Sequence, residues 1–411
     1  MNEFSKKFTN QTTSLYPIEV INKINIALQG KPDGRYSKEE LREITGLTDE
    51  IQYGIVKLNN RHYAVYHGKK RDSEIGSGSS GTAKLMQALD DNSIHVLKII
   101  RAKKISSDEF NQEIKNNITA GIGTGGLDRK SPTKGSQYLL IMKYIEGDDL
   151  QKHIMTTNGK SQMYWLDLAT NFLKSVRELH EKGLYHVDIK LDNYILTINN
   201  KIVPIDFGIS VNNNNGMALV ETDQIPPNVA PESERMIAEE GKLLISEKTE
   251  IYSAGRALYQ LLGEVVPEHT VIENGEEYHI EAEVKECVST SKIKHETTRG
   301  ELIDLIEKMT AESPDDRPSL NECIIQLNSI KQRLHAEIQQ SITSSSGLIL
   351  TKLASSDNPV IKFDKVTHEN YQVADSSIEK ERNKIGLAVE EQKENHEITN
   401  EDMLITRRRP R

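Results

Sequence analysis

Strand-like segments come first and long helix-like segments follow between about residues 70 and 334, and this order limits the folds open to the chain. The strand-like segments include "IHVLKII" and "QYLLIMKYI", and the helix-like segments include "TEIYSAGRALYQLLGE" and "LIDLIEKMTAE". Strands grouped before helices are typical of an α+β fold rather than of an alternating α/β sheet. We therefore expect two lobes, a β-rich one followed by an α-helical one.

The residues before this stretch predict an N-terminal extension, residues 1–69, made of helices and a hairpin. "PIEVINKINIALQG" has apolar residues on one helical stripe and stops at Gly30, and "SKEELREITGL" opens with a capping box of Ser37 and Glu40. "YGIVKLNNRHYAVYH" predicts two strands joined at Asn59 and Asn60, residues that tolerate the positive φ of a tight turn.

The end of the chain, residues 336–411, predicts a polar and flexible tail after a central domain of residues 70–335. The helix that begins "SLNECIIQLNSIKQRL" carries apolar residues at helical spacing, and Cys323 is expected to pack among them. Beyond this helix the composition turns to Ser, Asn, Lys and Glu, which is too polar to bury much surface.

Composition excludes several classes of protein. The 411 residues contain no apolar run near the roughly 20 residues that a membrane span requires, and the N-terminus lacks an apolar signal segment. A net charge of -10 argues against nucleic-acid binding, although the chain ends in "RRRPR". The two cysteines, Cys287 and Cys323, lack metal-ligand spacing. These features favour a soluble protein of the reducing cytoplasm.

The stretch "YHVDIKLDN" gathers polar side chains between apolar runs and is the candidate catalytic loop. Asp188 could accept or orient a proton, and Lys190 could meet a transferred phosphate. Asp206 ends the apolar segment "VPID", and with Asn193 it could supply oxygen ligands to Mg²⁺, which takes one or two protein ligands when bound to phosphates. The spacing predicts a base, a cation and metal ligands around one γ-phosphate.

A second candidate site precedes this loop. "GSGSSGTA" places Gly76, Gly78 and Gly81 where backbone amides could approach phosphates, although a serine-glycine linker would have the same composition. Lys98 lies in the apolar "HVLKII", where a buried ammonium needs an anionic partner, and Glu113 is the candidate partner. Because Lys98 and Glu113 follow the glycine-rich segment in this order, the two residues favour a binding site. The alternative is a surface lysine and a solvated glutamate with no common role.

These motifs, in order over about residues 72–334, resemble those of eukaryotic-type Ser/Thr protein kinases. The resemblance implies a bilobal protein-kinase fold that uses ATP and Mg²⁺. The implied catalytic residues are Asp188, Lys190, Lys98 and Glu113. The implied metal ligands are Asn193 and Asp206. The implied nucleotide-binding residues are Ile75, Gly76, Gly78, Gly81, Ala83, Val96, Lys98, Met142, Tyr144, Ile145, Asp149 and Ile195.

The resemblance also implies two supporting contacts. Glu232, in "NVAPES", is expected to form an ion pair with Arg317, in "SPDDRPS". His186 is expected to pack under Phe207 rather than to act as an acid or base.

Four positions depart from the pattern of these kinases. Val187 replaces the arginine before the catalytic aspartate, and Glu250 replaces a helix aspartate. Asn117 stands at a spine position that is usually apolar, which indicates either a weak spine or a helix register that differs by one residue. Ile225 stands where a threonine usually bridges the base and the lysine. The activation segment lies between Asp206 and Glu232, and its hydroxyl side chains are those of Ser210 and Thr222. Because Val187 cannot bind a phosphate, we expect activity without phosphorylation of this segment.

Three classes of function remain open. An active kinase that phosphorylates Ser or Thr of protein substrates explains every catalytic residue, and Lys190 favours Ser/Thr over Tyr. A nucleotide-binding pseudokinase scaffold would explain the departures, and a small-molecule phosphotransferase shares the base and the metal ligands.

Asp149 and Asp192 could receive an arginine upstream of the acceptor in the substrate. The glutamate-rich tail loosely resembles effector kinases that intracellular bacteria deliver into the host cytosol.

Overall fold

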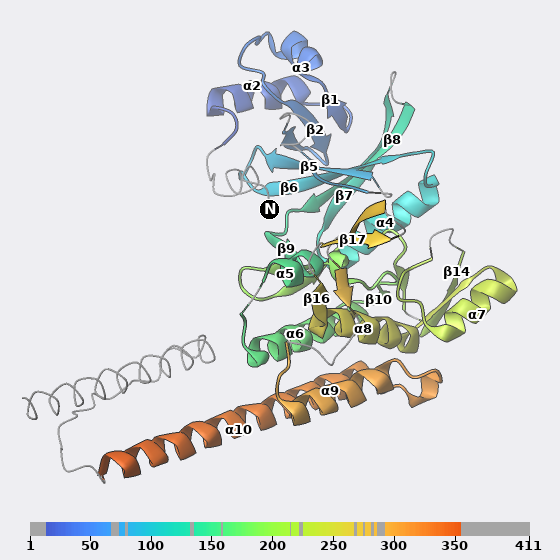
Figure 1. Cartoon of the computed structure of the whole chain (residues 1–411). Coiled ribbons are helices and arrows are strands. Elements are labelled where there is room, and N and C mark those ends of the chain that lie inside the picture. Colours follow the sequence, from blue (N-terminus) through green and yellow to red (C-terminus); the bar gives the residue numbers. More distant parts are fainter. Residues whose placement is uncertain are drawn as a thin grey trace, which may run out of the picture.

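The computed structural model describes residues 14–66, 74–78, 81–131, 135–157, 159–213, 215–221, 225–266, 269–273, 276–280, 283–285 and 292–354. A strand-rich region lies above a helical one (Figure 1), which confirms the expected α+β class. The helices within the described residues include none that is long and apolar enough to cross a membrane.

The upper region is one antiparallel sheet of eight strands in the order β1-β2-β3-β5-β6-β8-β7, with β4 also paired to β5. Its strands are β1 (Gly34–Tyr36), β2 (Gly54–Leu58), β3 (Arg61–Val65), β4 (Glu74–Gly78), β5 (Gly81–Ala88), β6 (Ile94–Arg101), β7 (Gly123–Ser131) and β8 (Gly135–Lys143). The predicted hairpin is confirmed, because β2 and β3 meet at Asn59 and Asn60, whose φ angles are 50° and 61°.

The N-terminal extension is built into this sheet. β3 pairs with the end of β5, residues 86–88, while β4 pairs with its beginning, so the expected boundary at residue 70 falls inside the sheet. β1 and β2 also contact β7 at the other edge, and the sheet therefore curls round an apolar interior. That interior consists of Val56, Leu58, Tyr63, Val65, Met86, Ala88, Leu97, Leu139 and Ile141.

Two helices of the extension, α2 (Ile18–Leu28) and α3 (Lys38–Thr45), cover the hairpin and confirm the two predicted helices. The capping box of Ser37 and Glu40 forms as expected. Lys57 of β2 is buried and donates from Nζ to the carbonyls of Leu28 and Lys31, at 2.8 and 2.6 Å. Its charge stabilises the C-terminal end of α2 and ties that helix to the sheet.

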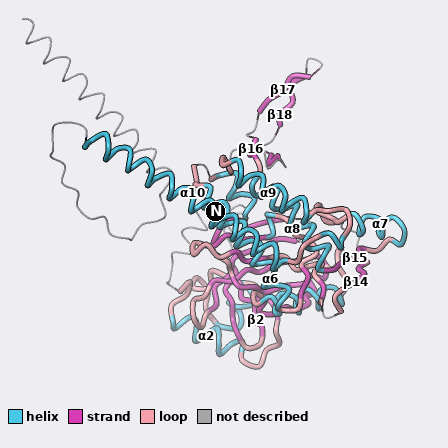
Figure 2. Tube along the Cα trace, turned by 90° about the horizontal axis from the view of Figure 1, so that it is seen from below, coloured by secondary structure: helices cyan, strands magenta, loops and turns pink. Residues whose placement is uncertain are grey.

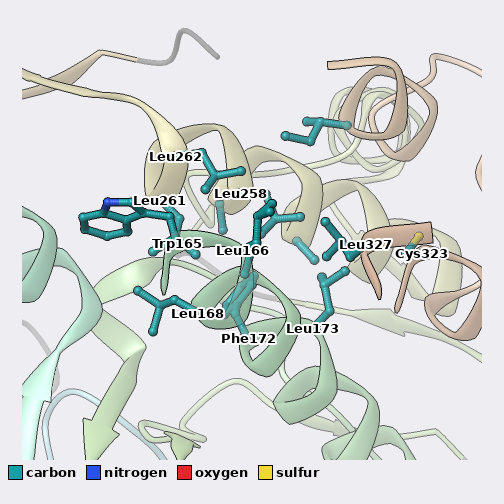
Figure 3. Close-up of a cluster of buried hydrophobic side chains, with 14 of the residues drawn as sticks. Trp165, Leu166, Leu168, Phe172, Leu173, Leu258, Leu261, Leu262, Cys323 and Leu327 are labelled. Carbon is teal, nitrogen blue, oxygen red and sulfur yellow. The ribbon is translucent and has the colours of Figure 1, made fainter. Parts of the chain in front are cut away.

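The lower region is helical. Its main helices are α5 (Leu150–Thr156), α6 (Gln162–Glu181), α7 (Pro231–Glu240), α8 (Glu247–Leu262), α9 (Glu296–Met309) and α10 (Leu320–Ala354). Trp165, Phe172, Leu258 and Leu327 share one core with Cys323 (Figure 3), so the packing role expected for that thiol is confirmed. Helix α10 continues past this core (Figure 2), so the first part of the expected tail is helical, and residues 355–411 lie outside the described residues.

Short strands form the connections around these helices. They are β9 (Gly147–Asp149), β10 (Leu184–Tyr185), β11 (Tyr194–Thr197), β12 (Ile202–Pro204), β13 (Val211–Asn212), β14 (Met217–Val220), β15 (Leu243–Ser246), β16 (Glu264–Val266), β17 (His269–Glu273), β18 (Glu276–Ile280) and β19 (Glu283–Lys285).

Candidate active site

Three charged side chains from three separate elements meet between the two regions. Lys98 of β6 places Nζ 2.7 Å from Oε1 of Glu113, on helix α4 (Ser107–Ala120), and 2.7 Å from Oδ1 of Asp206, which follows β12. Burial alone would lower the pKa of Lys98, but the carboxylates of Asp206 and Glu113 outweigh it and raise that pKa. The ion pair expected from the sequence is therefore present, with a second carboxylate on the same ammonium.

Asp188 is held in one orientation by its neighbours in the catalytic loop. Its Oδ2 accepts from Nδ2 of Asn193 at 2.9 Å and lies 2.9 Å from Nζ of Lys190. A single 3₁₀ turn, Leu191–Asn193, brings the asparagine back to the aspartate. Oδ1 of Asp188 is buried and has no hydrogen-bond partner within the described part of the chain.

Asn193 and Asp206 have the donor atoms that Mg²⁺ prefers. Nδ2 of Asn193 donates to the backbone carbonyl and to Oδ2 of Asp188, which leaves the amide oxygen as an acceptor. Burial alone would raise the pKa of Asp206, but Lys98 lowers it, so the carboxylate is ionised at neutral pH. No group of three His, Cys, Asp or Glu that could hold a metal occurs among the described residues. The pair fits a cation that takes its remaining ligands from phosphates and water.

The described residues of the glycine-rich segment form two paired strands beside the lysine. Gly78 pairs with Gly81 across β4 and β5, and Gly81 has φ +145°. A Cβ on Gly81 would lie 2.5 Å from the carbonyl oxygen of Ile99, so no other residue fits without displacing backbone. The side chain of Ile75 lies outside the described residues.

The predicted adenine-pocket residues fall on one face of the sheet and on the strands below it. Ala83 lies opposite Lys98, and Val96 lies opposite Met142, so the four side chains share a face. The segment that contains residues 144 and 145 then leads into β9, which pairs with β11.

Two further predicted residues meet in that second pairing. Ile195 lies opposite Asp149 across β11 and β9. The side chain of Asp149 also begins helix α5, because its Oδ1 accepts from the amide of Lys152 at 2.7 Å. One of its oxygens is therefore already in a hydrogen bond.

Glu250 anchors the catalytic loop, a role that the sequence did not reveal. Its two carboxylate oxygens accept from the backbone amides of His186 and Val187, both at 2.8 Å, and it lies 3.2 Å from Nε2 of His180. Burial alone would raise the pKa of Glu250, but His180, His186 and the backbone amide lower it. A glutamate thus holds the loop from a position where an aspartate is usual in the kinases that the chain resembles.

The two supporting contacts expected from the resemblance are confirmed. His186 lies 5.3 Å from the ring of Phe207, and its Nε2 is 3.0 Å from the carbonyl oxygen of Ile205, so its role is packing and orientation. Arg317 is buried and forms a bidentate ion pair with Glu232 at 2.7 and 2.8 Å.

The activation segment is fixed by backbone pairing and by an apolar cluster. β14, which lies within it, pairs antiparallel with β15. Val187 is buried with Leu243 and Ile245 of β15, and Ala218 and Val220 of β14 pack against them. We call these five residues the Val187 cluster.

The hydroxyl side chains of the activation segment are those of Ser210 and Thr222. Ser210 is buried, and its hydroxyl donates to the backbone carbonyl of His186 at 2.9 Å. Thr222 lies outside the described residues.

Asn228 is a second residue that contacts the catalytic loop and that the sequence did not reveal. Its Nδ2 donates to the carbonyl of Ile189, between the base and the lysine, at 2.9 Å, and its own carbonyl accepts from the hydroxyl of Ser253 at 2.7 Å. Ile225, at the usual threonine position, is 63% exposed. An asparagine beside two prolines looks like an ordinary turn residue, so nothing in the sequence distinguished it.

A protein kinase domain model matches residues 69–327, more than half of the chain, and the chain therefore belongs to the protein kinase family. It is 24% identical over 289 residues to the serine/threonine-protein kinase cds1 of Schizosaccharomyces pombe, over 67% of this chain and 60% of the relative. It is 23% identical over 364 residues to the serine/threonine-protein kinase KIN4 of Saccharomyces cerevisiae, over 85% of this chain and 44% of the relative. CBL-interacting protein kinase 21 of Oryza sativa is 27% identical over 196 residues, which are 46% of this chain and 36% of the relative.

Proposed function

We propose that the chain transfers the γ-phosphoryl group of ATP to Ser or Thr hydroxyls of protein substrates. The observation that carries this proposal is the joint presence of Lys98 bonded to two carboxylates and of Asp188 held between Asn193 and Lys190 in the catalytic loop. Asp188 orients the acceptor hydroxyl and takes its proton, while Lys190 faces the charge on the transferred group. Mg²⁺, held by Asn193 and Asp206, would neutralise phosphate charge.

The direct test uses the full chain, Mg-ATP and a degenerate peptide library. Asp188→Asn is expected to lower transfer on the order of 10²–10⁴-fold while nucleotide binding is retained. Asp206→Ala is expected to lose the Mg²⁺ dependence of nucleotide binding. Undiminished transfer by both variants would move the chemistry to other residues.

A nucleotide-binding pseudokinase is the competing function. Glu250 favours the active enzyme, because it makes the catalytic-loop contacts despite its departure from the usual aspartate. A thermal shift with Mg-ATP, without any transfer to the peptide library, would favour the pseudokinase instead.

We also propose that activity needs no phosphorylation of the activation segment. Val187 lies in an apolar cluster where a phosphate would be poorly solvated, and Ser210 is buried with its hydroxyl bonded. The test compares protein made without phosphorylation with a Ser210→Ala/Thr222→Ala double variant in the same assay. Similar rates support the proposal, whereas an inactive double variant that acidic substitutions rescue would overturn it.

The proposed substrates carry arginine two or three residues before the acceptor. Asp192 is exposed in the catalytic loop, and Asp149 lies at the start of α5. Asp192 and the oxygen of Asp149 that does not cap α5 would supply the carboxylate groups that suit a guanidinium partner. A peptide screen without preference for basic residues at these positions would reject this specificity.

The proposed compartment is a reducing cytosol, in the cell of origin or in a host cell. The buried, unpaired thiol of Cys323 agrees with such a compartment. A translocation reporter fused to the full chain would test delivery into a host.

A further inference from the structure

We propose that Asn116 is a positioning residue that fastens helix α4 to the segment carrying Asp206, and so keeps Glu113 on Lys98. This inference deepens the proposed function and rests on it. Asn116 is 1% exposed, and its Nδ2 donates to the carbonyl of Ser210 at 2.7 Å and to that of Phe207 at 3.3 Å. One side-chain amide therefore holds both sides of the turn that follows Asp206.

The orientation of this amide is fixed from the other side. Gln112, one turn earlier on α4, donates from Nε2 to Oδ1 of Asn116 at 2.8 Å. With its oxygen engaged there, the amide nitrogen of Asn116 must face the two carbonyls. Each carbonyl would lose a buried hydrogen bond if the helix moved away, which is costly in a site closed to water.

The position of Asn116 on the helix links it to the ion pair. Asn116 lies three residues after Glu113, and residues at that spacing share a face of a helix. A rotation or shift of α4 that breaks the hydrogen bonds of Asn116 therefore also withdraws Glu113 from Lys98. The two contacts should form and break together.

Other contacts hold α4 from the side of β7 and from the end of α6. A Cβ on Gly123 would lie 2.7 Å from backbone of Asn117, and one on Gly126 would lie 2.7 Å from Cδ1 of Ile114. Glycine at these two positions therefore allows β7 to pack closely against α4. Lys182, after α6, donates to the carbonyl of Ala120 at 2.7 Å. These contacts hold the helix against the sheet and against α6, while Asn116 joins it to the turn that follows Asp206.

The test compares two asparagines of the same helix. Asn116→Leu removes the donor to Phe207 and Ser210, whereas Asn117→Leu is the matched control, because among the described residues Nδ2 of Asn117 donates only to the carbonyl of Glu113 within the helix. Binding of a fluorescent ATP analogue with Mg²⁺ should weaken by roughly 10- to 100-fold in Asn116→Leu. The loss should be below about threefold in Asn117→Leu, whose bond lies within one helix.

Two further measurements separate positioning from a loss of folding. In a Lys98→Met background, Asn116→Leu should cause little additional loss of nucleotide binding, because the ion pair is already absent. Asn116→Asp keeps the shape of the side chain but cannot donate, so it should weaken binding in the same way if the leucine variant fails to fold. Because nucleotide binding needs no phosphoryl transfer, a failure of the proposed function would not mimic this result. Unchanged affinity in a folded Asn116 variant, or equal additional loss in the Lys98→Met background, would overturn the proposal.

Discussion

The catalytic loop contains a strained backbone conformation at Val187, and the carboxylate of Glu250 stabilises it. Val187 has φ +73°, a left-handed conformation that is unfavourable for a β-branched residue. Its amide and that of His186 donate to the two oxygens of Glu250. The buried carboxylate thus stabilises a conformation that the sequence around Asp188 would not adopt alone.

Removing the charge of Glu250 should change the pH dependence of stability. The folded-state pKa of Glu250 lies below its ordinary value of 4.5, so its contribution is complete above that pH and is lost as the pH falls through the folded pKa. Glu250→Gln should lower the free energy of unfolding by about 1.5–3 kcal/mol at pH 7, since the NH₂ group of glutamine cannot accept from a backbone amide. The difference from wild type, measured by urea unfolding, should narrow below pH 4.5. A constant difference across pH 4–8 would contradict this account.

Asn228 should affect turnover more than nucleotide binding. Asn228→Asp keeps the size of the side chain but cannot donate to the carbonyl of Ile189. We expect roughly tenfold lower kcat with unchanged affinity for Mg-ATP, because the carbonyl adjoins Asp188 and Lys190 rather than the glycine loop. Asn213→Asp is the control, since Nδ2 of Asn213 donates to the carbonyl of His180, away from these residues. Equal loss of kcat in both variants would count against a specific role.

The sequence predicted the contacts of side chains that belong to a short motif. It did not predict the side chains that bind backbone groups of residues distant in the sequence. Lys98 and Glu113 meet as expected. Glu250 reaches the amide of Val187 across 63 positions, and Asn228 reaches the carbonyl of Ile189 across 39. Such contacts depend on tertiary packing, so residue type and spacing alone do not reveal them.

At the scale of elements, the activation segment is anchored as a strand. β14 pairs with β15, and alternate side chains of β14 enter the Val187 cluster. Helical stripes and the hairpin turn were predictable because their signals lie within a few residues. The pairing of β14 with β15 could not be predicted, because both strands are short and lie more than 20 residues apart in the sequence.

Restoring the usual arginine at position 187 should therefore be harmful. Val187→Arg would place a guanidinium among the apolar side chains of the Val187 cluster. We expect a loss of about 2–4 kcal/mol in the free energy of unfolding, lower transfer and faster proteolysis within residues 211–221. Val187→Ala is the control and should cost only about 1 kcal/mol, since it removes methyl groups without adding charge. Higher activity in the arginine variant would show that the cluster does not fix the segment.

At the scale of the whole molecule, the extension and the kinase strands share one core. The face of the sheet opposite Lys98 carries Leu97, and it is covered by Val56 and Tyr63 of the extension. Helix α2 adds a second core that reaches Leu89, after β5. The extension was predictable as two helices and a hairpin, but its pairing across β3 and β5 was not, because register between distant strands is set by the assembled core.

Removing residues 1–69 should therefore abolish folding of the kinase region rather than release an independent domain. The deletion would expose Met86, Leu97, Leu139 and Ile141, and each buried side chain of this kind contributes about 1.5–3 kcal/mol. Their sum is comparable with the roughly 5–15 kcal/mol that stabilises a whole domain. We expect the truncated chain to be insoluble, with no thermal shift from Mg-ATP.

Two isoleucines of α2 can test whether stability depends on this shared core or is lowered by any substitution in the extension. Ile24 is fully buried in the core with Leu89, whereas Ile26, two residues later, is 72% exposed. In the full chain, Ile24→Asp should lower the melting temperature and weaken Mg-ATP binding together, because an unpaired carboxylate is placed in a core that shares strands β2 and β3 with the eight-stranded sheet. Ile26→Asp should change neither, since its side chain remains in solvent. Separate melting transitions for the extension and the kinase region in the Ile24 variant, with Mg-ATP binding intact, would show that the two are independent units after all.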